Sequence, residues 1–561
     1  MASLGRQHEQ ECPDPVELSV QGSVPGGFVA VSSANGPGRH CVGPLLLPTL
    51  TKLGVTSSKL SVTCATRVTC ATSCAICATR VTCATSFTCA TCCAACVTPA
   101  GRVWFSSRYL QSDTYKKNVA ANRIVVPEFG TRVELDPSLG LLEKSITYLR
   151  NIMPDNTDNC LINVVRYGQD VYACTETTIM RRLDPDTLDT LDKVDMAKFL
   201  TATMMSAHPH YEADGSIVNI CTAIADKGKT KYCLFTVPPT LPGDEPCVGL
   251  RGARSVLSVP SRQRLSPSYV HSFGLSARRA VLLETPHVMD VTRILSAYVR
   301  GACMASCLSF QPDGKTYIHV LDRSGSDHGA QGPQYFAGPM VVYHHANAYE
   351  DDEGQHLVVD VMAYSTDQLY SAFFFRGPNA VVGSTGGPPI SCRGLRYVLP
   401  LGPRQGAELG SNLVTMSGTT AQALLQKKGK IECIPEELFP DIDLPCINPR
   451  YHGKKYRYLF AIQFDGGITS KRMVKLDLET RETRLWEADN GWCGEPVFVA
   501  SPDASAEDDG VLLCVTASHD AERGVDIVVI DAREMKELGR ARTPSLLPMD
   551  MHGIFIPDHS A

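Results

Sequence analysis

From about residue 100 onward the chain consists of short apolar or alternating runs separated by turn residues such as Asp-Gly, Pro-Asp and Gly-Gly. Examples are 316–321 (TYIHVL), 356–362 (HLVVDVM) and 526–530 (DIVVI). Runs of this length between turn signals are typical of β-strands joined by tight turns. The sequence lacks the long periodic helices of an α/β enzyme. These patterns predict an all-β chain.

Weak internal repetition narrows the architecture. One pattern, an apolar residue followed by Asp and then by Thr and an acidic residue, occurs at Leu183–Asp189 and Leu476–Glu482, with a looser copy at Ile530–Lys536. Units of roughly 40 to 50 residues, built from antiparallel strands and tight turns, are typical of propeller blades. We therefore expect a β-propeller, with an array of β-sandwiches as the alternative.

The N-terminal region has a different composition. Nine of the 23 cysteines fall between residues 64 and 96, where TRVTCATS occurs at 66–73 and again at 79–86. Some cysteines of this tract are separated by two residues, a spacing that suits zinc coordination. A repeat without turn residues or core positions is, however, more typical of a disordered insert or a doubtful gene-model segment. We expect a disordered tail over 1–20 and one propeller domain over 21–561, with 45–99 as the insert.

Composition limits the classes of function and the compartment. Apolar residues make up 43% and charged residues 20% of the chain, which is enough for a sizeable core. The net charge, 53 − 59 = −6, argues against a nucleic-acid partner. The N-terminus lacks the basic and apolar regions of a signal peptide, and every apolar run is too short for a transmembrane helix. With 14 further cysteines scattered without a pattern, we expect a cytoplasmic protein with reduced thiols.

Histidines are the residues that point to chemistry, because phosphate-loop, dinucleotide-binding, serine-hydrolase and zinc-protease motifs are absent. The chain has 15 histidines, and in four contexts a histidine interrupts a strand-like run: 206–210 (SAHPH), 268–273 (SYVHSF), 341–346 (VVYHHA) and 548–555 (PMDMHGIF). Neutral imidazoles bind iron, zinc or copper well, although any one of them alone is more often a satisfied core residue. Their wide separation means that only the fold can assemble a site.

Two of these contexts hold a pair of histidines. Neighbouring side chains of a strand face opposite ways, so only one of His344 and His345 points inward. Pro209 prevents the same reasoning for His208 and His210.

A ligating histidine usually donates its second ring nitrogen to a carboxylate or carbonyl. Glu176, Asp443 and Glu495 lie in apolar contexts and are candidates for this role. Surface pairing of these carboxylates with basic neighbours is an equally good interpretation.

One amphipathic helix is expected after Asp290, which can cap it. Ile294, Leu295, Tyr298 and Val299 fall on one helical face, with Ala302 beyond them. Such a face either packs on the core or docks on a membrane surface.

Eight segments, in order from about residue 100 to 558, resemble the carotenoid cleavage oxygenases, and in particular the animal branch of β-carotene oxygenases and retinoid isomerohydrolase. They are Glu128–Thr131 (EFGT), Tyr172–Thr177 (YACTET), Ala207–His210 (AHPH), Ser268–Gly274 (SYVHSFG), Tyr343–Glu350 (YHHANAYE), Arg396–Leu401 (RYVLPL), Gly494–Phe498 (GEPVF) and His552–Pro557 (HGIFIP).

The resemblance implies a seven-bladed β-propeller with a few short helices on its top face and a non-haem Fe(II), the Fe²⁺ ion, on its axis. The ligands it implies are four histidines: His208, His271, His344 and His552. It also implies that Glu176 supports His271, that Asp443 supports His344 and that Glu495 supports His552.

Two of the chain's departures from the family bear on the site and on the fold. The family usually has Glu where this chain has Asp443, and a carboxylate one methylene shorter is expected to need a water or a shift to reach its imidazole. Ala34–Gly38 resembles the start of the family's first blade, but the strand expected next is replaced by the Thr/Cys/Ala tract. The first blade is therefore expected to be incomplete.

The activity implied is cleavage of a carotenoid double bond with O₂ to give apocarotenal or retinal products. Phe129, Thr175 and Tyr343 match positions that line the substrate cavity, and the helix after Asp290 matches the region that docks peripherally on membranes. Two alternatives stay open. One is isomerohydrolysis of all-trans-retinyl esters, and the other is a catalytically inactive carotenoid-binding propeller.

Overall fold

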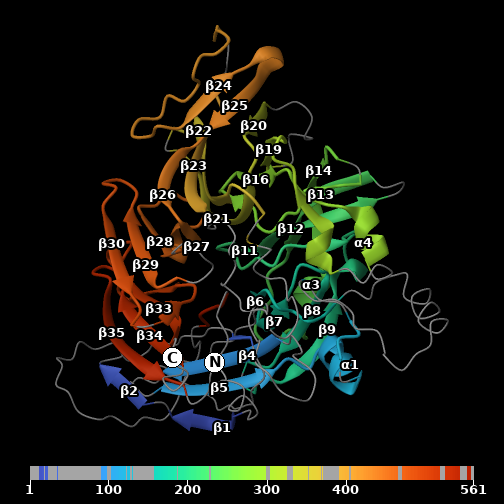
Figure 1. Cartoon of the computed structure of the whole chain (residues 1–561), viewed down its shortest axis with the longest axis vertical. Helices are drawn as coiled ribbons and strands as arrows, with labels where there is room; N and C mark the ends of the chain where they lie inside the picture. Colours follow the sequence, from blue (N-terminus) through green and yellow to red (C-terminus); the bar gives the residue numbers. More distant parts are fainter. Residues whose placement is uncertain are drawn as a thin grey trace.

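The computed structural model shows an all-β protein with few, short helices (Figure 1). It describes residues 12–17, 19–22, 34–35, 90–97, 103–121, 123–126, 129, 157–185, 187–225, 229–263, 265–297, 303–324, 333–351, 353–367, 369, 391–402, 406–464, 470–489, 491–518, 525–543 and 552–556.

Six sheets of four or more strands follow one another along the chain and form the blades of a propeller, and within the described residues all their strand pairs but one are antiparallel. The first blade consists of β6 (Asn163–Tyr167), β7 (Asp170–Cys174), β8 (Ile179–Leu183) and β9 (Thr190–Asp195). The second consists of β10 (Met204–Met205), β11 (His210–Tyr211), β12 (Ile217–Ala225), β13 (Lys229–Val237) and β14 (Arg254–Pro260). The third consists of β15 (Gly274–Leu275), β16 (Arg279–Glu284), β19 (Thr316–Asp322) and β20 (Gln334–Ala337), and it is extended by β25 (Lys430–Ile434) and β24 (Gln422–Leu425).

The other three blades complete the described part of the ring. The fourth blade consists of β21 (Val341–Glu350), β22 (His356–Tyr364), β23 (Cys392–Pro400) and β26 (Glu436–Pro440). The fifth consists of β27 (Ile442–Cys446), β28 (Tyr458–Gln463), β29 (Arg472–Asp477) and β30 (Thr483–Glu487). The sixth consists of β31 (Gly491–Cys493), β32 (Val497–Ala500), β33 (Gly510–Ser518), β34 (Val525–Asp531) and β35 (Lys536–Arg542), with β2 (Ser19–Gly22) paired to β35.

The expectation of seven blades is wrong, because the described residues form six. The N-terminal sheet, in the order β1 (Cys12–Glu17), β5 (Val103–Tyr109), β4 (Ala90–Val97) and β3 (Ala34–Asn35), is built differently from the blades. Its outer strand has two residues, and the register between β1 and β5 is interrupted. The Thr/Cys/Ala tract stands where a regular blade would need turn residues and alternating strands. Of 45–99, only β4 is described.

The remaining described elements are short. They are the two-stranded sheet β17 (His287–Met289) and β18 (Leu308–Phe310), the helices α1 (Asp113–Ala121), α3 (Val248–Arg251) and α4 (Val291–Ala297), and the 3₁₀ turns η1 (Met196–Lys198), η3 (Met304–Cys307), η4 (Lys427–Gly429) and η5 (Pro449–Tyr451). No helix in the described ranges is both long enough and apolar enough to cross a membrane.

The blades pack face to face, so their middle strands are buried on both sides. All nine residues of β22 are buried between β21 and β23, which explains why its sequence is a nearly continuous apolar run. In Figure 1, β6, β11, β21 and β27 lie towards the centre of the molecule, whereas β30 and β35 lie at its edge. Side chains at the ends of the inner strands can therefore converge.

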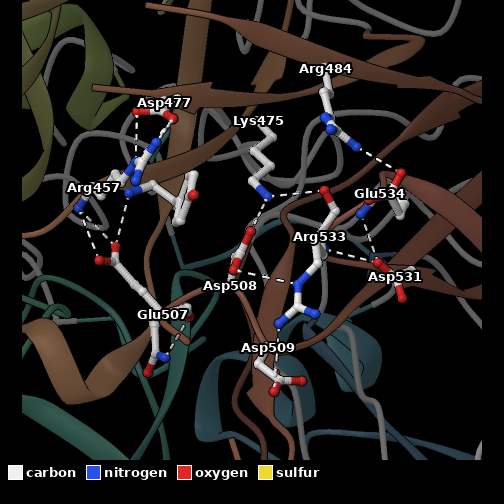
Figure 2. Close-up of polar contacts among 12 residues, drawn as sticks. Arg457, Lys475, Asp477, Arg484, Glu507, Asp508, Asp509, Asp531, Arg533 and Glu534 are labelled. Carbon is white, nitrogen blue, oxygen red and sulfur yellow. Dashed lines mark hydrogen bonds and ion pairs between the residues drawn. The ribbon is translucent and has the colours of Figure 1, made fainter. Parts of the chain in front are cut away.

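The last two blades are joined by a group of charged side chains that we call the interblade ion network (Figure 2). Lys475 of β29 is 5% exposed, and its Nζ donates to Asp508 Oδ2 at 2.6 Å and to the carbonyl of Arg533 at 3.0 Å. Arg457 pairs with Asp477 at 2.7 Å, and its backbone N–H donates to Glu507. Lys475, Asp508, Arg457 and Asp477 each have an opposite charge beside them, and Glu507 accepts the backbone N–H groups of Arg457 and Tyr458, which offsets the cost of burial.

Candidate metal centre

Four histidines from separate parts of the chain meet at the centre of the propeller, and we call them the histidine centre. They are His208 between β10 and β11, His271 before β15, His344 in β21 and His552 near the C-terminus. One ligand atom from each lies within 4.8 Å of all the others. His208 is half-buried and the other three are buried.

The ring nitrogens face one another. Nε2 of His271 lies 2.8 Å from Nε2 of His208 and 3.3 Å from Nε2 of His344. Two nitrogens bound to one metal ion at about 2.1 Å, and roughly 90 to 110° apart, would be about 3.0 to 3.4 Å from each other. The arrangement therefore fits a single first-row metal ion.

Three carboxylates lie behind the rings. Nδ1 of His271 is 2.6 Å from Glu176 Oε1, Nδ1 of His344 is 2.7 Å from Asp443 Oδ1, and Nδ1 of His552 is 3.0 Å from Glu495 Oε1. A carboxylate accepts the Nδ1 proton, which leaves the lone pair on Nε2. The histidine centre therefore presents lone pairs to its middle.

Asp443 reaches its histidine directly, although its shorter side chain suggested that a water or a shift would be needed. The backbone supplies the reach. The pairing of β27 with β28 is irregular between Asp443 and Cys446, and Leu444 has a φ of 51°. Such bulges change the direction in which a strand presents its side chains.

Two tyrosines that the sequence did not single out complete these contacts. The hydroxyl of Tyr269 donates to Glu176 Oε2, and that of Tyr364 donates to Asp443 Oδ2. Tyr269 lies inside the SYVHSFG segment, which is a signal that could have found it. Tyr364 ends β22, and nothing in its local sequence distinguishes it from a core residue.

Burial keeps two of the four imidazoles neutral. Burial, with the neighbouring His271 adding to the effect, lowers the pKa of His552 to about 3. Burial and the four neighbouring histidine rings hold the pKa of His208 well below its ordinary value. Neutral imidazole is the form that binds metal, so these two residues need not lose a proton at pH 7.

The carboxylates differ in their charge balance. Burial raises the pKa of Glu495 to about 8. Burial also acts to raise the pKa of Asp443, but the His344 ring and the hydrogen bonds from His344 and Tyr364 outweigh it. The pKa of Asp443 therefore lies below the ordinary value. A cation at the histidine centre would favour the charged form of both groups.

The second histidine of each pair lies outside the histidine centre. His210 Nε2 is 3.0 Å from the carbonyl of Phe273, and His345 Nδ1 is 2.8 Å from Ser272 Oγ. His356 shows how a satisfied core histidine looks: Nδ1 is 2.7 Å from Asp351, and Nε2 accepts the backbone N–H of Thr415.

The three expected cavity residues occupy different positions. Tyr343 is buried, with its ring centroid 5.7 Å from that of His271. Thr175 is buried next to Glu176 in the chain. Phe129 is half-buried against the largest hydrophobic core cluster.

Only part of the expected docking face can be described. Ile294 lies in α4 and packs against the hydrophobic core. Leu295 also belongs to α4, whereas Tyr298 and Val299 lie outside the described residues.

Comparisons with known proteins identify relatives of this chain. A family model described as RPE65, retinal pigment epithelial membrane protein, matches residues 78–557. The β,β-carotene 15,15′-dioxygenase of Mus musculus is 38% identical over 98% of this chain and 91% of that protein, and that of Gallus gallus is 37% identical over 100% and 99%. The mitochondrial carotenoid-cleaving dioxygenase of Homo sapiens is 33% identical over 82% and 80%.

Solved structures share the fold. The cobalt-substituted Synechocystis apocarotenoid oxygenase superposes with a TM-score of 0.67 at 18% identity, over 98% of both chains. A chimera of that oxygenase with RPE65 gives a TM-score of 0.66 at 19% identity, over 98% of both chains. The extent of the family match and the identity to the dioxygenases show that this chain belongs to the carotenoid cleavage oxygenase family, which includes RPE65.

Proposed function

We propose that this chain is a non-haem iron dioxygenase that cleaves a double bond of a β-carotene-like carotenoid with O₂. The observation that carries the proposal is the convergence of four imidazoles on one point, three of them backed by carboxylates at Nδ1. The relatives named as carotene dioxygenases over nearly the whole chain support the choice of substrate.

In this proposal His208, His271, His344 and His552 hold Fe(II). When bound, Fe(II) supplies the activation of O₂ beside a conjugated double bond. Glu176, Asp443 and Glu495 hold the Nδ1 proton of three ligands and so keep each Nε2 directed at the metal.

The surrounding residues orient the substrate and exclude water. Tyr343 packs its ring against that of His271, and Thr175 lies beside Glu176, so both border the region where a polyene would meet the metal. Phe129 is proposed to line the more distant part of the cavity. A buried apolar surround favours a carotenoid, which has no charged group.

Membrane docking through α4 is also proposed, because a carotenoid is stored in lipid. Leu265 is 50% exposed, and its carbonyl accepts the N–H of Val291 at the start of α4. From the sequence alone, Leu295, Tyr298 and Val299 are proposed to belong to the docking face, whereas Ile294 packs against the hydrophobic core. Loss of phosphatidylcholine-vesicle binding in Leu265→Asp would support this surface, and unchanged binding would contradict it.

The test of activity uses the iron-loaded protein with β-carotene in detergent, under air and under argon, with products separated by chromatography. We expect oxygen-dependent cleavage. Retinal alone means central cleavage, and unequal apocarotenals mean eccentric cleavage. His356→Gln is a matched control, because it disrupts a buried histidine–carboxylate pair away from the histidine centre and should leave activity intact.

A folded protein that binds iron but gives no product from β-carotene would contradict the dioxygenase proposal. The same preparation is then tested with all-trans-retinyl ester, where product would identify an isomerohydrolase. No product in either assay would identify a carotenoid-binding propeller.

A further inference from the structure

Tyr364 is linked to the histidine centre through one carboxylate. Tyr364 is 2% exposed, and its hydroxyl donates to Oδ2 of Asp443, whose Oδ1 lies 2.7 Å from Nδ1 of His344. The three side chains come from β22, β27 and β21. A chain of hydrogen bonds thus runs from the end of a buried strand to one of the four imidazoles.

Each oxygen of Asp443 has one side-chain partner, and the backbone N–H of Leu444 is a third donor to the carboxylate. Without the phenol, only the His344 ring and that backbone N–H would limit rotation about the last bond of the aspartate, whose torsion is broad. The phenol of Tyr364 occupies the second oxygen and defines the plane of the carboxylate. Since Asp443 is 2% exposed, water has little access to replace the phenol if it is removed.

The other two carboxylates show that this contact is not a general requirement of burial. Glu176 receives a phenol from Tyr269, whereas Glu495 receives a backbone N–H from Gly553 and, among the residues that the structure describes, no phenol. Asp443 has the shortest side chain of the three and sits on an irregular strand. The phenol is therefore an addition to the backbone N–H of Leu444 at this carboxylate, which Glu495 does without.

We propose that Tyr364 is a positioning residue that acts through Asp443 to hold the imidazole of His344 in the orientation that binds metal. The inference rests on the proposed role of His344 as a metal ligand. Removing a residue that supports a metal ligand typically weakens metal binding about 10- to 100-fold. Tyr364 is one contact further away, so about a tenfold loss is expected.

The first test is the affinity of the full-length, metal-free protein for Co²⁺, measured by competition with a chelator, together with the visible spectrum of the bound cobalt. Tyr364→Phe removes one oxygen and is expected to weaken Co²⁺ binding about tenfold and to change the cobalt spectrum. A wild-type affinity with a wild-type spectrum would overturn the proposal.

Tyr456→Phe is the matched control. Its hydroxyl also donates to a buried aspartate, Asp360 Oδ2 at 2.8 Å, and Tyr456 belongs to the same core cluster as Tyr364. It should lose thermal stability as Tyr364→Phe does, yet keep the affinity and the cobalt spectrum of the wild type. If both variants weaken cobalt binding equally, Tyr364 acts only on overall stability and the proposal fails.

A double-mutant cycle separates action through Asp443 from a parallel effect. Asp443→Asn replaces one carboxylate oxygen by an NH₂ group, so only one of His344 and Tyr364 keeps an oxygen acceptor. If Tyr364 acts through the carboxylate, Tyr364→Phe should cause little further loss of Co²⁺ affinity in a chain that already carries Asp443→Asn, whereas two losses that add would contradict the proposal.

Two further outcomes are distinguishable. Should Tyr364→Phe not fold, Asp443→Asn alone tests the link, and an unchanged cobalt affinity and spectrum there would overturn the proposal. A folded wild-type protein that binds no Co²⁺ would contradict the proposed metal site itself.

Discussion

The histidine centre and the interblade ion network are both buried polar groups formed by residues far apart in the chain. In the network the polar atoms satisfy one another, since Lys475 sits between a carboxylate and a carbonyl and Arg457 lies beside Asp477 (Figure 2). In the histidine centre each Nδ1 that faces a carboxylate is satisfied, but the Nε2 lone pairs of His271 and His344 face each other at 3.3 Å. Two facing lone pairs stabilise nothing until a cation lies between them.

The difference indicates which group is built for function. The interblade ion network is complete within the chain and joins two blades. The histidine centre is complete only with a cation added. His356, whose two ring nitrogens both have partners inside the chain, shows that a buried histidine–carboxylate pair is not enough to mark a metal site.

The largest difference in function between the histidine centre and the interblade ion network is expected from His271→Ala. Loss of one of four ligands should lower iron affinity more than about 100-fold, since loss of a mere supporting residue already costs about 10- to 100-fold. Carotenoid cleavage should then fall by at least about 1000-fold, because the cofactor carries the chemistry. Iron content and product formation measure this, and a variant that keeps one iron per chain would contradict it.

The converse change is Lys475→Met in the interblade ion network. It leaves the carboxylate of Asp508, which is 6% exposed, with only the half-exposed Arg533 guanidinium 3.8 Å away. Removing the close partner of a buried charge should destabilise the fold by about 3 kcal/mol. Chemical denaturation measures the loss. The folded fraction should still bind one iron per chain, and a loss of iron affinity would mean that the two groups are coupled.

Between about pH 7 and 5, acid should affect the histidine centre more than the network, since the network contains no histidine and, of its carboxylates, only Glu507 has a pKa raised by burial. The folded-state pKa of His552, about 3, lies below the ordinary value near 6.5, and the pKa of His208 is also held well below that value. The unfolded chain therefore binds protons first as pH falls. Stability present above pH 6.5 is lost below it, on the order of 2 kcal/mol per histidine by about pH 5.

Denaturation midpoints of the metal-free protein between about pH 7 and 5 test this expectation. His552→Gln removes one of the titrating groups and should show a shallower decline. An identical decline in the variant and the wild type would contradict the assignment of His552.

The smallest effect is expected at the edge of the network. Arg484 and Glu534 form a pair at 2.8 Å with both side chains about half exposed. Arg484→Met should change the stability by less than about 1 kcal/mol, because solvent screens exposed pairs. A loss as large as that of Lys475→Met would show that burial is not what separates the two.

The sequence predicted the all-β propeller because turn residues and strand-length runs are local signals. The number of blades was not predictable in the same way, because it depends on how a low-complexity N-terminal stretch pairs with β5. The expectation of seven came from the family resemblance, and the six described blades correct it.

For the site, spacing alone could not bring together residues as distant as His208 and His552. The resemblance named the four histidines, and the structure brings them together. Tyr364 was not found, because in a strand buried on both faces, such as β22, apolar pattern carries no information about which side chain faces a site. The reach of Asp443 depends on backbone irregularity in β27, which side-chain length does not reveal.

The most direct measurement is X-ray absorption at the iron edge of the iron-loaded full-length protein, with iron quantified per chain. The account predicts one iron per chain and a spectrum fitted by about four imidazole nitrogens, without a carboxylate bound directly to the metal. Absence of iron from the folded protein, or a ligand shell dominated by carboxylates, would contradict it.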